Sequence, residues 1–307
     1  MAGTLFGVDV SMFQGSINWG QVKKSGVTFA VARCVREGGG IDPNYARNVA
    51  RQRKAGLIPG AYAFLAGGGV AKSQARSFIK AVGNPKGMLV MLDVERPSAH
   101  PVPSLGDVRT FVAEWKKVHP EHPLLIYGSS GSVLGSIAKQ ADLHTLGPLW
   151  LAFYREGSGT TPNAFYDSIG GNHANQWRLK MGGWAGPSIW QFTSKRVQVP
   201  GIVNSKGKHR RVDTNAFRGT REQLLALTGG GSVPIAMSAA KPKPDHAPPK
   251  PAAGKVFHAV KPGESLSGIA AKFGFKGFRA LIDMFPENHK FKANPGLIHV
   301  GDRVRVN

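Results

Sequence analysis

Two acidic residues separated by one position, Asp93 and Glu95, end the apolar run in the segment Met-Leu-Val-Met-Leu-Asp-Val-Glu-Arg-Pro at residues 88–97. A continuous apolar run of this length is typical of a strand buried on both faces. Side chains at i and i+2 of a strand share a face, so both carboxyl groups should project together from the strand's carboxyl end. Glycoside hydrolysis needs such a pair, one protonated acid and one charged carboxylate. A solvated strand end before the turn at Pro97 is the alternative interpretation.

Two further acids extend this pattern. Asp9 ends the first apolar segment of the chain, and Asp213 lies in the last. If the sheet closes into a barrel, its first and last strands are neighbours, and the four carboxylates converge at one rim. Concentrating like charge is costly unless the cluster has a use. Each acid taken alone could equally be a loop or helix-cap residue.

The elements that must position these acids follow a strand–helix alternation over residues 1–217. We predict an α/β fold, an irregular TIM-like (β/α) barrel whose last strands are joined by irregular loops, including a long Gly-rich loop over residues 155–187. The expected strands are Phe6–Val10, Phe29–Val35, Gly60–Leu65, Met88–Glu95, Leu124–Ser129, Leu149–Tyr154, Ser188–Thr193 and Arg211–Asn215. The expected helices are Pro43–Ala55, Val70–Val82, Leu105–His119 with Ser104 as N-cap, and Ser132–Gln140.

The composition limits the function classes. A chain of 307 residues with 41% apolar residues can form one large and one small domain. Its net charge of +22 favours polyanionic partners, but no nucleic-acid-binding module is recognisable, so we expect no nucleic acid. No apolar run is long enough to span a membrane, and the N-terminus lacks a signal peptide pattern. Cys34 is expected to be a buried hydrophobe, and the ten His lack metal-ligand spacing, so no metal or cofactor is expected.

A change in composition divides the chain into domains. Residues 229–254 are rich in Gly and then in Pro, which is typical of a linker. We therefore predict a catalytic barrel over residues 1–228, a linker over 229–254 and a small domain over 255–307.

Five motifs in order resemble glycoside hydrolase family 25, the Chalaropsis-type lysozymes common as bacteriophage endolysins. They are Gly7-Val8-Asp9-Val10-Ser11 with Phe13-Gln14-Gly15, then Leu92-Asp93-Val94-Glu95, Trp150-x-Ala152-x-Tyr154, Trp190-Gln191-Phe192 and Val212-Asp213-x-Asn215-x-Phe217. The resemblance implies that Glu95 is the general acid. It implies that Asp93 stays ionised, either stabilising the transition state or orienting the N-acetyl group of the substrate, while Asp9 and Asp213 position water or sugar. Substrate-assisted and inverting routes both remain open.

Sugar subsites need aromatic platforms and a few polar groups. Candidates that alternate inward near strand ends, with ordinary barrel core as the alternative, are Tyr62, Phe64, Tyr127, Trp150, Tyr154 and the polar Gln191. Glu37, which closes the second strand, is a further candidate, with an exposed acid as the alternative. The family often has a polar residue or His where this chain has Ala63.

Residues 256–270 and 294–306 resemble a LysM domain, a small βααβ fold that binds N-acetylglucosamine-containing polymers. Pro286 to Lys292 looks like an insertion, and the usual Asn after the second helix is not plainly placed. By resemblance, the glycan-binding residues are Gly263, Glu264, Ser265, Leu266, Asn294, Pro295, Gly296 and Leu297.

Together these features predict a phage-type endolysin, a monomeric N-acetylmuramidase whose partner is bacterial peptidoglycan, with anionic wall polymers as a second partner. It would reside in the host cytoplasm until released to the wall at lysis; a virion-associated lysin would look the same. One alternative is a non-catalytic wall-binding protein. The other is a chitinase-type hydrolase, although such enzymes usually show a longer acidic series before the Glu, where this chain has Leu89, Val90 and Met91.

Overall fold

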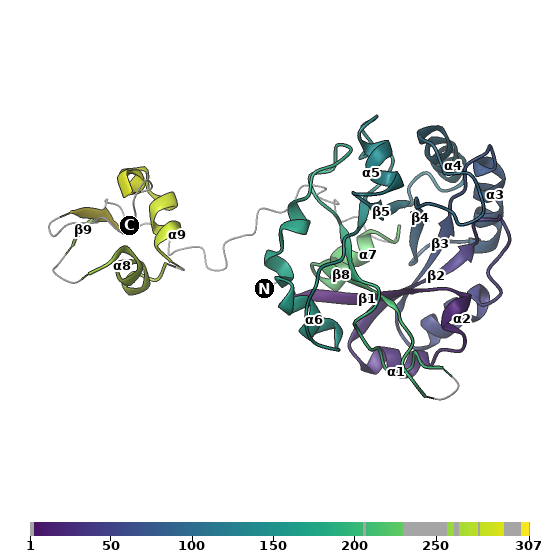
Figure 1. Ribbon diagram of the computed structural model, residues 1–307, viewed down its shortest axis with the longest axis horizontal. Helices are drawn as coiled ribbons and strands as arrows, with labels where there is room; N and C mark the ends of the chain where they lie inside the picture. The colour runs from purple at the N-terminus through teal and green to yellow at the C-terminus, as the bar shows by residue number, and fades with distance from the viewer. Residues whose placement is uncertain are drawn as a thin grey trace. The chain divides into compact units, whose positions relative to one another are not determined.

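The computed structural model describes residues 3–204, 207–229, 257–260, 264–275, 277–291 and 302–306. The chain forms two compact units, Met1–Lys241 and Pro242–Asn307 (Figure 1). The division falls inside the predicted linker, nearly all of which lies outside the described residues. The exact domain boundaries therefore stay a prediction.

Within the described residues of the first unit, eight strands form a closed barrel in sequence order. Neighbouring strands are parallel from β1 to β7, whereas β8 is antiparallel to both β7 and β1. The predicted irregular (β/α) barrel is confirmed. The strands are β1 Thr4–Val10, β2 Val27–Val35, β3 Ile58–Phe64, β4 Leu89–Asp93, β5 Leu125–Ser129, β6 Leu149–Ala152, β7 Ile189–Thr193 and β8 Asp213–Arg218.

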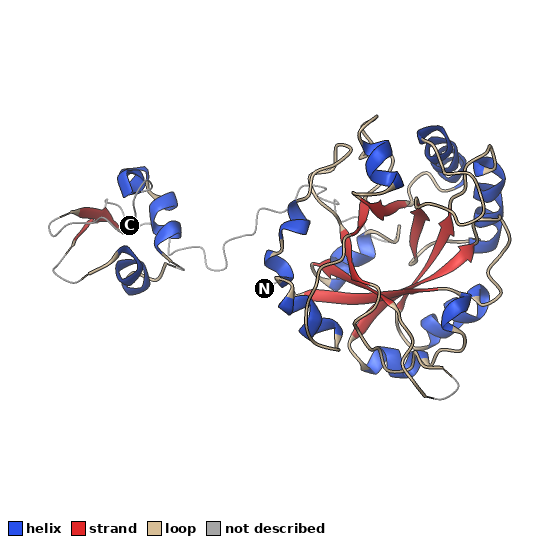
Figure 2. Ribbon diagram, in the orientation of Figure 1, coloured by secondary structure: helices blue, strands red, loops and turns tan. Residues whose placement is uncertain are grey.

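Helices surround this barrel, as Figure 2 shows with the strands in the middle of the unit. They cover apolar outward-facing strand residues, and several begin at side-chain caps that satisfy free backbone N–H groups. Ser104 caps α4 as predicted, with its Oγ accepting from the Asp107 N–H. The helices are α1 Trp19–Lys24, α2 Tyr45–Lys54, α3 Ala71–Val82, α4 Leu105–Val118, α5 Val133–Ala138, α6 Pro162–Ser168 and α7 Arg221–Ala226, with short 3-10 helices at Met12–Gln14, Gly171–His173 and Asn175–Arg178.

Alternation along each strand divides the core into two layers. On β4, Val90 and Leu92 join the cluster between the barrel and its helices, while Leu89 and Met91 join the cluster inside the barrel. Because Asp93 continues the inward set, its side chain belongs to the barrel interior at the carboxyl end of the strand. The same parity applies to Asp9 on β1, where Val8 and Val10 face the helices.

The barrel interior is filled rather than hollow. Gly7 is required there, because a Cβ atom at this position would lie 2.2 Å from the ring of Phe29 on the neighbouring strand. Leu224 of α7 and Leu227 just after it join the same interior cluster. This close packing rigidly supports the side chains at the carboxyl ends of the parallel strands.

The second unit contains β9 Phe257–Ala259, α8 Leu266–Lys272, α9 Phe278–Met284, a 3-10 helix at Pro286–Phe291 and β10 Arg303–Arg305. β9 and β10 pair in antiparallel fashion. Asn288, fully buried, donates to the carbonyls of Leu281 and Arg305 and accepts from the Arg305 N–H. The segment that looked like an insertion therefore carries the polar residue that joins α9 to β10.

Three predictions of local structure need correction. Residues 155–187 are not wholly irregular, because Thr161 caps α6 and Pro162 begins it. β4 ends at Asp93, so Glu95 lies just beyond the strand. β8 extends to Arg218 rather than ending at Asn215, because its pairing with β1 continues to Thr4.

Candidate active site

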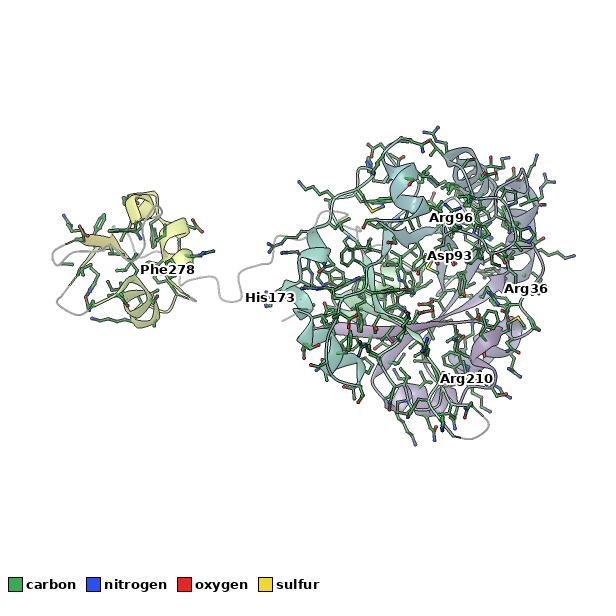
Figure 3. All side chains as sticks on the ribbon, viewed as in Figure 1. Arg36, Asp93, Arg96, His173, Arg210 and Phe278 are labelled. Atoms are coloured by element: carbon green, nitrogen blue, oxygen red, sulfur yellow. The ribbon has the colours of Figure 1, made fainter. Side chains whose placement is uncertain are left out.

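The four predicted carboxylates come from three elements at one end of the barrel. Asp9 and Asp213 face each other directly in the register of β1 and β8. Asp93 ends β4, and Glu95 follows it (Figure 3 labels Asp93). Asp9 and Asp93 are 6% and 5% exposed, whereas Glu95 and Asp213 are half-buried. The structure thus brings together the acids that the sequence singled out.

Asp9 is held by a network of side-chain hydrogen bonds. Its Oδ2 accepts from Gln191 Nε2 at 2.9 Å and from Asn215 Nδ2 at 2.8 Å. The Gln191 amide oxygen accepts from the hydroxyls of Tyr127 at 2.8 Å and Tyr154 at 2.6 Å. These acceptor contacts fix the orientation of the Gln191 amide, so that its N–H group points at Asp9. No role for Asn215 was predicted beyond its place in the motif that contains it.

Trp150 extends this hydrogen-bond network through Asn215. Its indole N–H donates to Asn215 Oδ1 at 2.8 Å, and its ring packs edge-on against Phe29. The Trp150 side chain is 0% exposed. The prediction that Trp150 forms a sugar platform is therefore wrong, since no face of the ring is open to a ligand. Its role is to orient the Asn215 amide.

Asp93 lies in contrasting surroundings, because its buried Oδ1 has no hydrogen-bond partner. Burial raises the pKa of Asp93 well above its ordinary value, and the nearby charges of Glu95, Asp9 and Asp213 raise it further. The expectation that Asp93 stays ionised is thus not supported by its surroundings. Burial raises the pKa of Asp9 as well, but hydrogen bonds from Asn215 and Gln191 oppose this effect, so Asp9 is better suited than Asp93 to carry the charge.

The remaining two acids are also biased toward their protonated forms. Burial and the charge of Asp9 raise the pKa of Glu95. Burial, followed by the charges of Asp9 and Glu95, raises the pKa of Asp213, and a hydrogen bond between Asp213 and Asp9 adds to this effect. A proton held on Asp213 can be donated to the Asp9 carboxylate. The cluster can therefore present a protonated acid beside a fixed carboxylate, as glycosidic bond cleavage requires.

Arg33 supplies positive charge at this end of the barrel. Its Nε pairs with Asp42 Oδ2 at 2.9 Å, and Asp42 is almost fully buried. The same Asp42 oxygen accepts from the Met12 N–H at 3.0 Å. The guanidinium lies over the ring of Phe13, which is 68% exposed. Phe13, which sequence reasoning missed as a site residue, is thus an open aromatic surface held directly after β1.

The other predicted sugar-binding aromatics differ in access. Tyr154 is 50% exposed, so its ring is available while its hydroxyl holds Gln191. Phe64 is half-buried and lies opposite Asp93 in the register of β3 and β4. Tyr62 and Tyr127 belong to the interior cluster below the acids. Both side chains are buried, so they offer little surface to a ligand.

Glu37 is engaged within the protein. Its carboxylate accepts from the backbone N–H of Ser98 at 2.7 Å and from the Ser98 hydroxyl. These bonds hold the pKa of Glu37 below its ordinary value. Glu37 therefore fastens the loop between β4 and α4, and in this structure its carboxylate is not directed to a sugar.

The predicted glycan-binding residues of the second unit are described only in part. Ser265 caps α8, with its Oγ accepting from the Gly268 N–H, and Leu266 is buried in the unit's core. Glu264 pairs with His258 at 2.6 Å. Gly263, Asn294, Pro295, Gly296 and Leu297 lie outside the described residues.

In the part of the chain that the structure describes, no group of three His, Cys, Asp or Glu side chains is arranged to hold a metal ion. No helix in the described ranges has the length and apolar character of a membrane span.

Comparison with known proteins agrees with this geometry. A sequence model described as "Glycosyl hydrolases family 25" matches residues 8–202. Uncharacterized protein YegX of Escherichia coli O157:H7 is 30% identical over 236 residues, which cover 74% of each chain. Lysozyme M1 of Streptomyces globisporus is 28% identical over 241 residues, which cover 72% of this chain and 70% of the relative. The bacterial lysozyme structure from Streptomyces coelicolor, 23% identical, superposes with a TM-score of 0.57 over 73% of this chain and 97% of that one, which shows a shared fold. The chain therefore belongs to glycosyl hydrolases family 25 and is a glycoside hydrolase.

Proposed function

We propose that this enzyme is an N-acetylmuramidase, which hydrolyses the β-1,4 bond between N-acetylmuramic acid and N-acetylglucosamine in bacterial peptidoglycan. The observation that carries the proposal is the set of four carboxyl groups at one end of the barrel, with Asp9 fixed by two amide donors while Glu95 is biased toward its protonated form. The relatives named as lysozymes support the choice of substrate.

Glu95 is the general acid in this proposal. It is half-buried beside Asp9, so its carboxyl group keeps a proton to pH values where an exposed glutamate is ionised. Donating that proton to the glycosidic oxygen makes the leaving sugar neutral. The positive charge that develops at the other sugar is stabilised by the Asp9 carboxylate and by any ionised partner in the cluster.

Asp93 orients the substrate's N-acetyl group. Its buried Oδ1 lacks a partner in the free enzyme, and such an atom costs free energy until a donor meets it. The amide N–H of an N-acetyl sugar is a donor of suitable chemistry. A hydrogen bond there would turn the acetamido oxygen toward the reacting carbon, which favours the substrate-assisted route over the inverting one.

The second unit is a LysM domain in this proposal, binding the same polymer. The sequence motifs and the order β9, α8, α9, β10 support it. Joining the two units by a tether raises the local concentration of glycan at the catalytic unit. The net charge of +22 adds attraction to anionic wall polymers, so wall binding should weaken as salt rises.

A phage-type endolysin is the biological role that we propose, with release to the wall at host lysis. The combination of a muramidase unit with a basic wall-binding unit supports it. Capture of the protein in purified virions would instead support a virion-associated lysin.

A pair of single substitutions tests the catalytic proposal. Glu95→Gln keeps the shape of the side chain and removes the acid, so lysis of purified walls should fall by about 10²–10⁴-fold. Glu121→Gln, at an exposed position of the same unit, is the matched control and should leave the rate unchanged. Both variants should still sediment with walls. An unchanged lytic rate in Glu95→Gln would refute the proposal and favour a non-catalytic role for the cluster. Faster cleavage of chitin than of peptidoglycan would favour a chitinase-type enzyme.

A further inference from the structure

A cavity lies between the loops that follow β4 and β5, and Arg96, which follows Glu95 in the sequence, is one of its lining residues. Its volume is about 500 Å³, within the range of sites that hold small ligands. The residues that line it are Arg96, Val102, Pro103, Ser104, Leu105, Gly131, Ser132, Val133, Ser136, Ile137 and Gln140. Neither Glu37 nor any of the predicted sugar-binding aromatics is among them.

The topology places this cavity next to the catalytic residues. Asp93 and Tyr127 are partners in the register of β4 and β5. Both loops leave the same end of these two adjacent parallel strands. Arg96 immediately follows Glu95 (Figure 3 labels Arg96). A group attached to a sugar at Glu95 can therefore extend into the cavity.

The lining combines the chemistry that recognises an acidic peptide. Arg96 is an exposed cation, and the residues that line the cavity include no Asp or Glu. The hydroxyl groups of Ser132 and Ser136 donate to the backbone carbonyls of Ser129 and Ser132, so their oxygens can accept hydrogen bonds from peptide N–H groups. Val133 and Ile137, which are largely buried, offer an apolar floor for small side chains. A polymer of N-acetylglucosamine carries no carboxylate for Arg96. Peptidoglycan glycan without its peptides carries only the lactyl carboxylate next to the sugar ring, and no peptide side chain for this floor.

The wall of the cavity is held in place before any ligand binds. Glu37 fastens Ser98, and the Gly67 N–H donates to the Pro101 carbonyl at 2.8 Å. A Cβ atom at position 67 would lie 2.3 Å from the Val102 carbonyl oxygen, so only glycine allows this close approach. Preorganisation of this kind lowers the entropy cost of binding.

We propose that this cavity is the subsite for the stem peptide of peptidoglycan, with Arg96 pairing to a peptide carboxylate. The inference rests on the proposed muramidase function and deepens it. In peptidoglycan the stem peptide hangs from the lactyl group of N-acetylmuramic acid, and it carries alanine methyl groups, amides and free carboxylates. Occupation of the cavity makes the enzyme selective for glycan that still bears its peptides.

The test compares two substrates made from one glycan preparation: soluble strands with their stem peptides, and the same strands after an amidase has removed them. The wild type should cleave the peptide-bearing strands with the higher kcat/KM. Arg96→Gln should lose about tenfold on those strands, mostly through KM, because a hydrogen bond to a charged group contributes about this factor. On the stripped strands, which keep only the lactyl carboxylate next to the sugar ring, Arg96→Gln should lose clearly less. Arg109→Gln, an exposed position on α4, is the control and should match the wild type on both.

A second variant blocks the cavity and leaves the positive charge of Arg96 in place. Ser136 is exposed and lines the cavity, so Ser136→Tyr should fill it and reproduce the selective loss. Equal losses on both substrates, or a wild type with no preference for peptide-bearing strands, would overturn the inference. If the wild type cleaves neither substrate, the proposed muramidase function itself fails, and the inference fails with it.

Discussion

Replacing Asp93 by asparagine should stabilise the catalytic unit at neutral pH while reducing activity. Burial and three neighbouring acids raise the pKa of Asp93 well above its ordinary value of 3.8. In the unfolded chain the carboxyl ionises freely, so at neutral pH folding must either take up a proton or bury a charge. Each unit of pKa difference is equivalent to about 1.4 kcal/mol. Asp93→Asn should therefore raise the free energy of unfolding at neutral pH by on the order of 1 kcal/mol, which corresponds to a few degrees in Tm.

The pH dependence gives the sharper test. Stability from a carboxyl with a raised pKa is fully present below its unfolded value and is lost as the pH rises through its folded value. The advantage of Asp93→Asn should therefore disappear near about pH 3, where both states of the wild type are protonated. Tryptophan fluorescence follows the catalytic unit alone, because all six Trp lie between residues 19 and 190. Asp167→Asn, at an exposed position, should change stability little at any pH. A less stable Asp93→Asn at pH 7, or a gain that does not vary with pH, would refute the reasoning.

Three further outcomes follow from the site. Gln191→Leu removes one hydrogen-bond donor from Asp9, so the pKa of Asp9 should rise. The acidic limb of the pH–rate profile should then move to higher pH, and kcat should fall by about 10–100-fold. An acidic limb that does not move would contradict this role of Gln191. Trp150→Phe leaves the buried Asn215 Oδ1 without its indole donor and should lower the free energy of unfolding by about 1–3 kcal/mol in urea denaturation, whereas wild-type stability would show that the bond is dispensable. Proton NMR of the first product should show retention of the anomeric configuration, as substrate assistance requires, and inversion would assign a different role to Asp93.

The fold could be read largely from the sequence, because buried parallel strands appear as apolar runs. The direction of each strand in the sheet could not be predicted in the same way. A buried antiparallel strand such as β8 presents the same run as a parallel one, so its reversal follows only from closure against β1 and β7. The helix at Pro162–Ser168 did carry a signal, since Thr161 followed by Pro162 is a typical helix start.

The acids of the site were predictable because they lie at or next to strand ends: Asp93 ends β4, while Asp213 begins β8, which runs antiparallel to its neighbours. Their electrostatic roles were not predictable. Asp93 and Asp9 have the same side chain and similar exposure, and they differ in their hydrogen-bond partners. Those partners come from Gln191 and Asn215, which lie far from Asp9 in sequence. Burial depth also separated Trp150 from Tyr154, although the spacing made both look like sugar platforms. The neighbours of each side chain in the folded barrel determine its hydrogen bonds and its exposure, and the spacing of residues along the sequence does not reveal them.

The central claim is that this enzyme cuts the bond on the N-acetylmuramic acid side, with Glu95 as the acid. Mass spectrometry of soluble products from purified peptidoglycan, after borohydride reduction of the new ends, tests it most directly. The wild type should release products with reduced N-acetylmuramic acid ends, and Glu95→Gln should release essentially none. Reduced N-acetylglucosamine ends, or undiminished product from Glu95→Gln, would contradict it.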